Sequence, residues 1–129
     1  EEYSSIVEAA LKIDEIIERE AAKNGLIHVD GKKEFALGPG RKVVLVDTFG
    51  TLDEDRWWDA EAYANGETIE LSKEFVRSHY ISTGHQANLK TARDSGADEP
   101  PIPALPQEVI DQTANLYSSM YERLTSGKF

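Results

Sequence analysis

The spacing of apolar residues predicts an amphipathic helix over residues 2–23. Apolar side chains recur there at steps of three and four residues, with Glu and Lys between them: Ile6, Ala10, Ile13, Ile17 and Ala21. Asn24-Gly25 follows the last apolar position. Both residues tolerate a left-handed backbone, so we expect the helix to end there.

The next segment predicts a β-hairpin. After the apolar lead-in 26–29, residues 33–37 alternate between polar and apolar, and residues 42–46 are rich in Val. The segment Gly38-Pro39-Gly40-Arg41 between them has the composition of a turn. We therefore expect two antiparallel strands joined by these four residues.

The rest of the chain predicts helices separated by loops. A loop over 48–53 precedes a short helix carrying Trp57, Trp58 and Tyr63. Ser72 is the expected N-cap of a further helix. Four of the five prolines lie between residues 100 and 106, which predicts an extended arm over 94–105. A last helix begins after Pro106, with an apolar stripe running to Leu124.

These elements indicate a single α+β domain over residues 1–129, with an antiparallel hairpin extending a sheet and the first and last helices packed on its apolar face. The chain begins with Glu1-Glu2 and its only methionine is Met120. We therefore expect it to be a portion of a longer chain. A portion cut from a sheet exposes apolar surface, which favours self-association into a homo-oligomer.

Charge and composition narrow the function classes. The chain holds 24 Asp and Glu against 14 Lys and Arg, a formal charge of -10. This balance disfavours binding to nucleic acid or to a membrane surface. No apolar run approaches the ~20 residues of a membrane span. The absence of Cys excludes a thiolate zinc site. We expect a cytoplasmic protein that acts on small molecules or proteins.

The hairpin brings candidate chemistry to one face. With a symmetric four-residue loop, Lys32 faces Asp47 and Glu34 faces Leu45, so Lys32, Glu34 and Asp47 share a face. Two carboxylates can hold a hard cation, and an ammonium beside them can hold a phosphate. The alternative is a solvated face with one ordinary ion pair. In the same symmetric register, the side chains of Phe35, Leu37, Val44 and Val46 are expected on the opposite face, in the core.

The loop after the hairpin carries further candidates. The planar guanidinium of Arg56 could bind a phosphate or a carboxylate. Asp53, Glu54 and Asp55 precede it, and they could equally be the acidic first turn of a helix.

Several strings resemble the phosphoribosylaminoimidazole-succinocarboxamide synthase (SAICAR synthetase) family. Residues 30–36 are similar to its Asp-Thr-Lys-Phe-Glu-Phe-Gly signature, and residues 44–58 to its Leu-Ile-Asp-Glu and Thr-Pro-Asp-Ser-Ser-Arg-Phe-Trp segment. Residues 75–77, 105–110 and 121–125 resemble its Phe/Tyr-Val-Arg, Leu-Pro-Glu-Glu-Val and Tyr-Glu-Arg-Leu-Thr strings. The motifs occur in the family's order over nearly the whole chain. They indicate its C-terminal portion, without the ATP-binding N-terminal lobe.

The resemblance implies a carbon–nitrogen ligase of purine biosynthesis. Such an enzyme uses ATP and Mg²⁺ to join carboxyaminoimidazole ribonucleotide to L-aspartate through an acyl phosphate. By the same resemblance, Glu34 and Asp47 would hold Mg²⁺ and Lys32 would lie near the nucleotide phosphates, with Lys32 and Asp47 as the catalytic residues. Asp53, Arg56 and Arg77 would bind substrate.

The chain departs from the family strings at several positions. Thr48 replaces a Glu, Glu54 and Asp55 replace two Ser before the arginine, and Gly31, Lys33 and Ala36 replace Thr, Phe and Gly. Two added anions beside Arg56 should weaken anion binding there. The alternative function is therefore a non-catalytic binding domain that diverged from this ligase. For the portion alone, we expect no activity.

Overall fold

The computed structural model describes residues 2–129. Helices and strands account for most of this range. In chain order they are α1 Glu2–Lys23, β1 Leu26–Gly31, β2 Glu34–Leu37, the 3-10 turn η1 Pro39–Arg41, β3 Val43–Val46, β4 Asp55–Asp59, α2 Ala60–Ala64, α3 Glu74–Ser82, α4 His85–Ser95 and α5 Gln107–Thr125. The first and last helices and the hairpin are confirmed. Gly25, with φ of 66°, ends α1 as expected.

The strands form two separate antiparallel pairs, β1 with β4 and β2 with β3. The predicted helix at Trp57 and Trp58 is wrong, because both residues lie in β4, opposite His28 and Ile27 of β1. Periodicity over so few residues does not distinguish a strand from a short helix. The helix begins only at Ala60, where the Asp59 carboxylate accepts the backbone N–H groups of residues 61 and 62.

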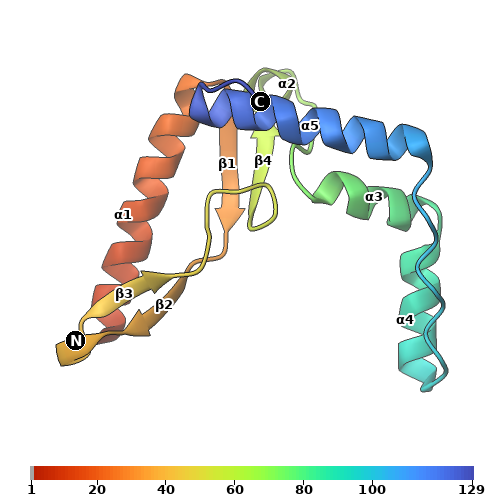
Figure 1. The fold of residues 1–129 in the computed structure, drawn as a ribbon, viewed down its shortest axis with the longest axis horizontal. Helices are drawn as coiled ribbons and strands as arrows, with labels where there is room; N and C mark the ends of the chain where they lie inside the picture. Colours follow the sequence, from red (N-terminus) through yellow and green to blue (C-terminus); the bar gives the residue numbers. More distant parts are fainter. Residues whose placement is uncertain (1) are drawn as a thin grey trace.

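The core lies beside the β1–β4 pair rather than on the hairpin. Its buried apolar residues come from five different segments: Ala21, Leu26, Leu52, Trp57 and Met120. In Figure 1, α5 runs across the top of β1 and β4, and α1 descends on one side toward the β2–β3 hairpin. The apolar stripes of the first and last helices thus meet around Trp57.

The hairpin departs from the prediction in register. Glu34 pairs with Val46 and Phe35 with Leu45, one residue away from the expected pairing. The cause is the loop, which includes Lys42 and contains η1, with Gly40 and Arg41 at φ of 67° and 59°. The longer loop moves every partner by one position.

The predicted burial of the hairpin is therefore wrong for most of its residues. Val44 and Val46 remain 43% and 38% exposed, and Leu37 remains 44% exposed. Phe35 is half-buried on the face opposite Val44 and Val46, which it shares with Leu37, Val43 and Leu45. The hairpin thus presents an uncovered apolar face, which includes Ala36, Val44 and Val46.

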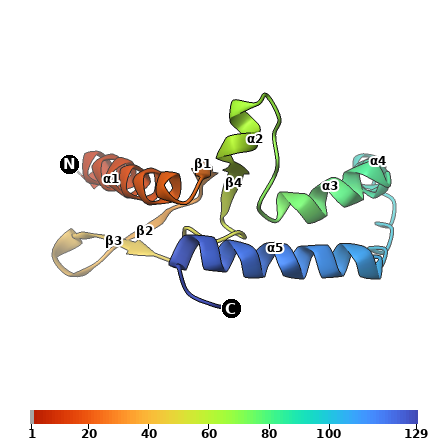
Figure 2. The ribbon, with the colours of Figure 1, turned by 90° about the horizontal axis from the view of Figure 1, so that it is seen from above.

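The second half of the chain forms a helical extension. Figure 2 shows α3 and α4 following one another away from the β1–β4 pair, with α5 running back beside α3. Ser72 is buried, and its Oγ accepts the backbone N–H of Glu74 at 3.3 Å, close to its predicted capping role. The helix α4 was not predicted and occupies the start of the expected arm. The extended segment begins after Gly96.

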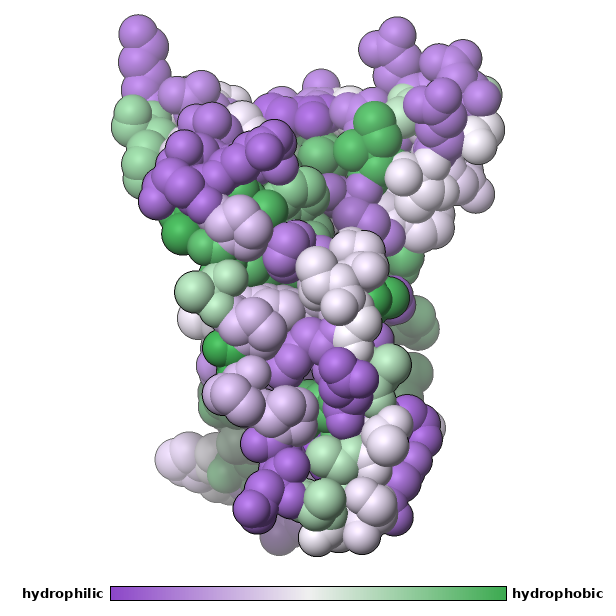
Figure 3. All heavy atoms as spheres, turned by 90° about the vertical axis from the view of Figure 1, so that its right-hand side faces the viewer, coloured by the Kyte–Doolittle hydropathy of each residue, from purple (hydrophilic) through white to green (hydrophobic). Residues whose placement is uncertain are grey.

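The exterior of this extension is mostly polar. Figure 3 views the molecule from the α4 side and shows hydrophilic side chains over most of the surface, with small apolar patches between them. Among residues 2–129, no helix has the length and apolar character required to cross a membrane.

Candidate functional site

Lys32 and Glu34 lie together on the solvent side of the segment that joins β1 to β2. The Lys32 Nζ donates a hydrogen bond to the Glu34 Oε1. This hydrogen bond raises the pKa of Lys32, and the charges of Glu34, Glu54 and Asp47 add to the effect. We call Lys32, Glu34, Asp47 and Glu54 the hairpin cluster.

Asp47 joins this cluster by a different route from the one predicted. With Glu34 paired to Val46, a regular strand would point Asp47 to the opposite face. Instead, β3 ends at Val46, and Asp47 has a left-handed backbone with φ of 68°. Its Oδ1 accepts the backbone N–H of Thr48 at 2.8 Å. The predicted cross-strand geometry is therefore wrong, although Asp47 still acts on Lys32 through its charge.

Arg56 lies on the exposed side of β4 and is already bound. Its Nε donates to Asp30 Oδ1 at 2.8 Å, and its Nη2 donates to Asp30 Oδ2, so the contact is bidentate. This contact raises the pKa of Arg56 and lowers the pKa of Asp30. Asp55, one of the two anions expected to oppose anion binding at Arg56, turns into the interior instead. Any anionic ligand of Arg56 competes with Asp30.

Asp53 is fixed by two segments far away in the sequence. The Tyr117 hydroxyl of α5 donates to its Oδ1 at 2.7 Å. The Lys73 Nζ donates to its backbone carbonyl. Partial burial, the hydrogen bond and the Asp53 charge together raise the pKa of Tyr117 to about 12. These contacts hold the β3–β4 loop against α3 and α5.

Arg77 lies one helical turn into α3, and its Nη1 donates to Glu74. The Glu74 charge also contributes to the raised pKa of Arg56. Asp53, Arg56 and Arg77 thus gather where the β3–β4 loop meets the start of α3. We call these three residues, with Lys73 and Glu74, the loop–helix cluster.

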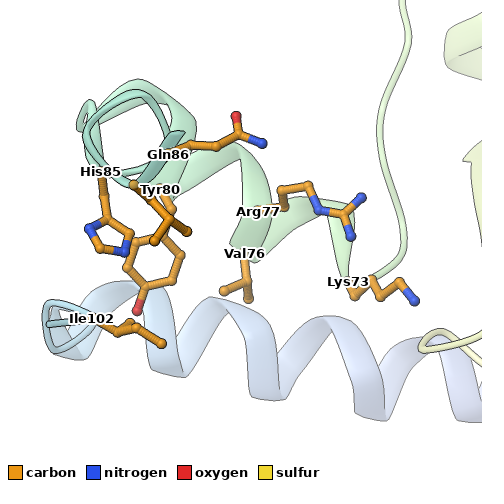
Figure 4. A pocket seen from close by; sticks show the side chains of 8 residues that line it. Lys73, Val76, Arg77, Tyr80, His85, Gln86 and Ile102 are labelled. Atoms are coloured by element: carbon orange, nitrogen blue, oxygen red, sulfur yellow. The ribbon is translucent and has the colours of Figure 1, made fainter. Parts of the chain in front are cut away.

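A cavity of about 390 Å³ adjoins this cluster between α3, α4 and the extended arm. Figure 4 shows Tyr80 and His85 directed toward Ile102 at one end and Arg77 and Lys73 at the other. The Tyr80 ring lies 5.4 Å from the His85 ring, and its hydroxyl donates to the Pro103 carbonyl at 2.9 Å. An apolar floor beside cationic groups suits a flat ligand with a negative substituent.

The hairpin cluster fits Mg²⁺ only together with a phosphate ligand. Within residues 2–129, no group of three His, Asp or Glu side chains is arranged to hold a metal ion. Mg²⁺ commonly binds one or two carboxylates and takes its remaining oxygens from nucleotide phosphates and water. In this cluster Glu34 and Asp47 are the carboxylates that could bind the ion with such ligands, and Lys32 is an ammonium beside Glu34.

Some residues of these clusters, and some of the residues that hold them in place, were not predicted as site residues. Asp30 entered only as the first letter of a family string, and Glu74, Lys73 and Tyr117 were assigned to helices. No local pattern identifies them, because their contacts depend on how β4, α3 and α5 meet.

Comparisons with known proteins agree with the resemblance in the sequence. The SAICAR synthetase family model matches residues 1–93. Phosphoribosylaminoimidazole-succinocarboxamide synthase of Thermoplasma acidophilum is 53% identical over all of this chain, and that of Thermoplasma volcanium is 50% identical. The chain spans 44% of the length of each.

The fold has a close counterpart among solved structures. A SAICAR synthetase in complex with ADP aligns with a TM-score of 0.62 and 27% identity, over 98% of this chain and 39% of that one. The chain thus corresponds to part of a longer enzyme. The narrower prediction that this part is the C-terminal portion gains no support from these comparisons and is not retained. On the family match and the curated relatives together, this chain belongs to the SAICAR synthetase family.

Proposed function

We propose that the chain is part of an ATP-dependent ligase that joins carboxyaminoimidazole ribonucleotide to L-aspartate. In this reaction the substrate carboxylate takes the terminal phosphoryl group of ATP and forms an acyl phosphate. The aspartate amine then attacks the acyl carbon, and phosphate leaves as the amide forms. The substrates are small metabolites, so we place the reaction in the cytoplasm.

One observation carries the proposal most directly. The residues that match the family strings form two charged clusters on the two sides of the β3–β4 loop, within a chain of this family. The hairpin cluster combines carboxylates and an ammonium, which suits a magnesium–nucleotide. The loop–helix cluster contains two arginines, which suit phosphate and carboxylate groups.

Each cluster then has a distinct task. Glu34 and Asp47 would hold Mg²⁺, which when bound would offset the charge of the nucleotide phosphates. Lys32 would exchange its bond to Glu34 for a phosphate oxygen. Arg56 would exchange Asp30 for an anionic group of the ribonucleotide or aspartate, and Arg77 would do the same from Glu74. Asp53 would contact substrate from the loop that Tyr117 and Lys73 hold in place.

Steady-state kinetics of the full-length enzyme tests these tasks. We expect Glu34→Gln with Asp47→Asn to lower kcat/KM by at least about 100-fold, since both act on developing phosphoryl charge. Arg77→Gln should raise one substrate KM by about tenfold, the cost of losing a charged hydrogen bond. Arg93→Gln is the matched control, because Arg93 of α4 forms an exposed pair with Glu99 of the extended arm. Equal kinetics for Arg77→Gln and Arg93→Gln would contradict the assignment.

The 129-residue chain alone should show no ligase activity, because it spans less than half of the length of its relatives. We propose that the remainder of the enzyme, including an ATP-binding lobe, closes over the nucleotide. Measurable ligase activity of the purified 129-residue chain would contradict this statement.

A second candidate function is a non-catalytic binding domain. The contact of Arg56 with Asp30 favours it, because a substrate anion has to displace the Asp30 carboxylate before it can bind the guanidinium. Calorimetric titration of the full-length protein with magnesium–ATP separates the two candidates. Binding that weakens in Glu34→Gln with Asp47→Asn supports the ligase, and absence of binding supports the second candidate.

A further inference from the structure

A buried polar network lies beneath the two clusters. The side chains of His28 and Asp55 are 3% and 0% exposed, and the His28 Nε2 lies 2.7 Å from the Asp55 Oδ2. The Lys33 Nζ lies 3.4 Å from the same oxygen and 3.4 Å from the Asp14 Oδ1 of α1, and the Lys33 side chain is 5% exposed. Three of these side chains, those of His28, Lys33 and Asp55, therefore meet in the interior, and the partly exposed Asp14 of α1 borders them.

The network depends on a missing side chain. Gly31 pairs with Asp55 in the β1–β4 ladder, and a Cβ placed on Gly31 would overlap the Asp55 carboxylate. The carboxylate thus occupies the volume that a side chain at position 31 would require. Any residue with a Cβ at 31 would displace Asp55 from His28 and Lys33.

Three departures from the family strings meet at this point. Gly31, Lys33 and Asp55 stand where those strings have Thr, Phe and Ser. Each substitution alone would be unfavourable. Gly31 alone would leave an empty volume, Lys33 alone would bury an unpaired ammonium, and Asp55 alone would bury an unpaired carboxylate. Together the carboxylate fills the volume and pairs with the ammonium.

The network alternates with the residues of the two clusters. Asp55 points inward and the next residue, Arg56, points outward on the same strand. Lys33 points inward between Lys32 and Glu34, both of which are exposed. Alternation in extended chain thus ties the outward direction of Lys32, Glu34 and Arg56 to the burial of Lys33 and Asp55.

Stability alone is a poor explanation for these buried charges. The Asp55 Oδ1 and the Asp14 Oδ1 are buried without a hydrogen-bond partner. Buried ion pairs are often no more stable than apolar residues of similar volume, while removal of one partner is costly.

We propose that Asp55, with Lys33, is a positioning residue that fixes the orientation of Arg56 and of the Lys32–Glu34 segment. Asp55 can be buried because Gly31 has no side chain in that volume and because His28 lies within hydrogen-bond distance of its carboxylate. The effect on catalysis rests on the proposed function, whereas the coupling within the network does not.

A double-mutant cycle measured by thermal unfolding tests the coupling in the full-length protein. Lys33→Met and Asp55→Asn should each lower the Tm by roughly 5–10 °C, because each removes the opposite charge that faces the other group in the interior. The double variant should lose less than the sum of the two single losses. Lys42→Met is the matched control on the exposed hairpin loop. Additive losses would overturn the proposed coupling.

A steric cycle tests the role of Gly31 independently. Gly31→Ala should lower the Tm strongly in the parent protein and much less in the presence of Asp55→Ala, which removes the whole overlapping carboxylate group. An equal loss in both backgrounds would show that Asp55 does not occupy that volume.

Kinetics separates positioning from stability. Asp55→Asn should raise the KM for ATP or for the ribonucleotide by about tenfold at a temperature where the variant is folded. Met120→Ala removes a fully buried core side chain on α5 and should change KM less than about twofold while also lowering the Tm. Matching KM values for the two variants would overturn the positioning role. If the parent enzyme shows no ligase activity, the proposed function fails, while the two unfolding cycles still decide the network.

Discussion

At the residue scale, the charged side chains of the clusters already have partners within the chain. Arg56 is bound by Asp30, Arg77 by Glu74 and Lys32 by Glu34. Each of these groups is substantially exposed, with the exception of the Glu74 side chain, which is 17% exposed. Exposed pairs of this kind contribute little to stability, so a ligand of higher charge can replace the carboxylate at small cost.

The pair between Arg56 and Asp30 predicts a pH-dependent contribution to stability. Arg56 lowers the pKa of Asp30, so the pair stabilises the fold above the ordinary pKa of an aspartate, and this contribution is lost as the pH falls through the lowered value. We expect Arg56→Gln to lower the free energy of unfolding slightly at pH 7 and by less at pH 3. Urea unfolding of both proteins at the two pH values measures it. A larger cost at pH 3 would contradict the sign.

Tyr117 predicts the opposite behaviour at high pH. Its pKa is raised to about 12 by burial and by Asp53, so the folded chain keeps the phenol proton after an exposed tyrosine has lost it. The contribution of Tyr117 to stability is complete below pH ~10 and is lost as the pH rises toward the folded value. Absorbance titration of the parent chain minus that of Tyr117→Phe should isolate this late transition. In Asp53→Asn the transition should occur at lower pH.

At the element scale, the first and last helices are joined at one point. Arg123 of α5 donates from its Nη2 to the carbonyls of Asn24 and Gly25 at 3.1 and 2.9 Å, where α1 turns into β1. It also contacts the Asp59 carboxylate at 3.3 Å, where β4 turns into α2. The Arg123 side chain thus joins α5 to two junctions, the one between α1 and β1 and the one between β4 and α2.

Loss of this side chain should therefore loosen the whole core. We expect Arg123→Ala to lower the free energy of unfolding by about 1.5–3 kcal/mol, the range for hydrogen bonds made by a charged group. Arg93→Ala, which breaks an exposed pair with Glu99, should lower the free energy of unfolding much less. Chemical denaturation of both variants measures the difference. Similar losses in the two would contradict the central place of Arg123.

The elements also show how far a single sequence predicts this fold. Long periodic segments such as α1 and α5 were predicted to within a residue or two, because the stripe that they bury is repeated over many turns. The strand β4 was missed because Trp57 and Trp58 are consecutive apolar residues, so the strand shows no alternation of polar and apolar positions. Its partner β1 is also remote in sequence. The hairpin register was wrong by one residue because the prediction omitted Lys42 from the loop.

For the candidate site, the sequence could indicate the charged groups but not their partners. Lys32 and Glu34 are two apart in one extended segment, so their contact follows from alternation alone. The contacts of Asp53 with Tyr117 and of Asp30 with Arg56 join residues 64 and 26 positions apart. Such contacts depend on tertiary packing, so local sequence patterns do not predict them.

At the scale of the whole molecule, the chain is open on the hairpin side. The face formed by Ala36, Val44 and Val46 has no cover within residues 2–129, although strands of this kind normally pack one face against other elements. The chain spans 44% of its Thermoplasma relatives, so the rest of the enzyme is available to cover this face.

The 129-residue chain should consequently self-associate when it is prepared alone. We expect Val44→Lys to reduce the apparent mass at a given concentration, because a charge on the uncovered face opposes its burial. Lys42→Met, on the adjacent loop, should leave the mass unchanged. Sedimentation velocity over a range of concentrations measures both. A parent chain that remains monomeric throughout would contradict the prediction.

The overlap between Gly31 and the Asp55 carboxylate also restricts the order in which the two positions can change during evolution. In a lineage that has a larger residue at position 31, the change to glycine has to come before Asp55 appears or together with it. Return to a larger residue at 31 is open only after Asp55 has been replaced. Chains of this family that carry an aspartate at this position should therefore carry glycine opposite it, and intermediates with both larger residues should be absent among working enzymes.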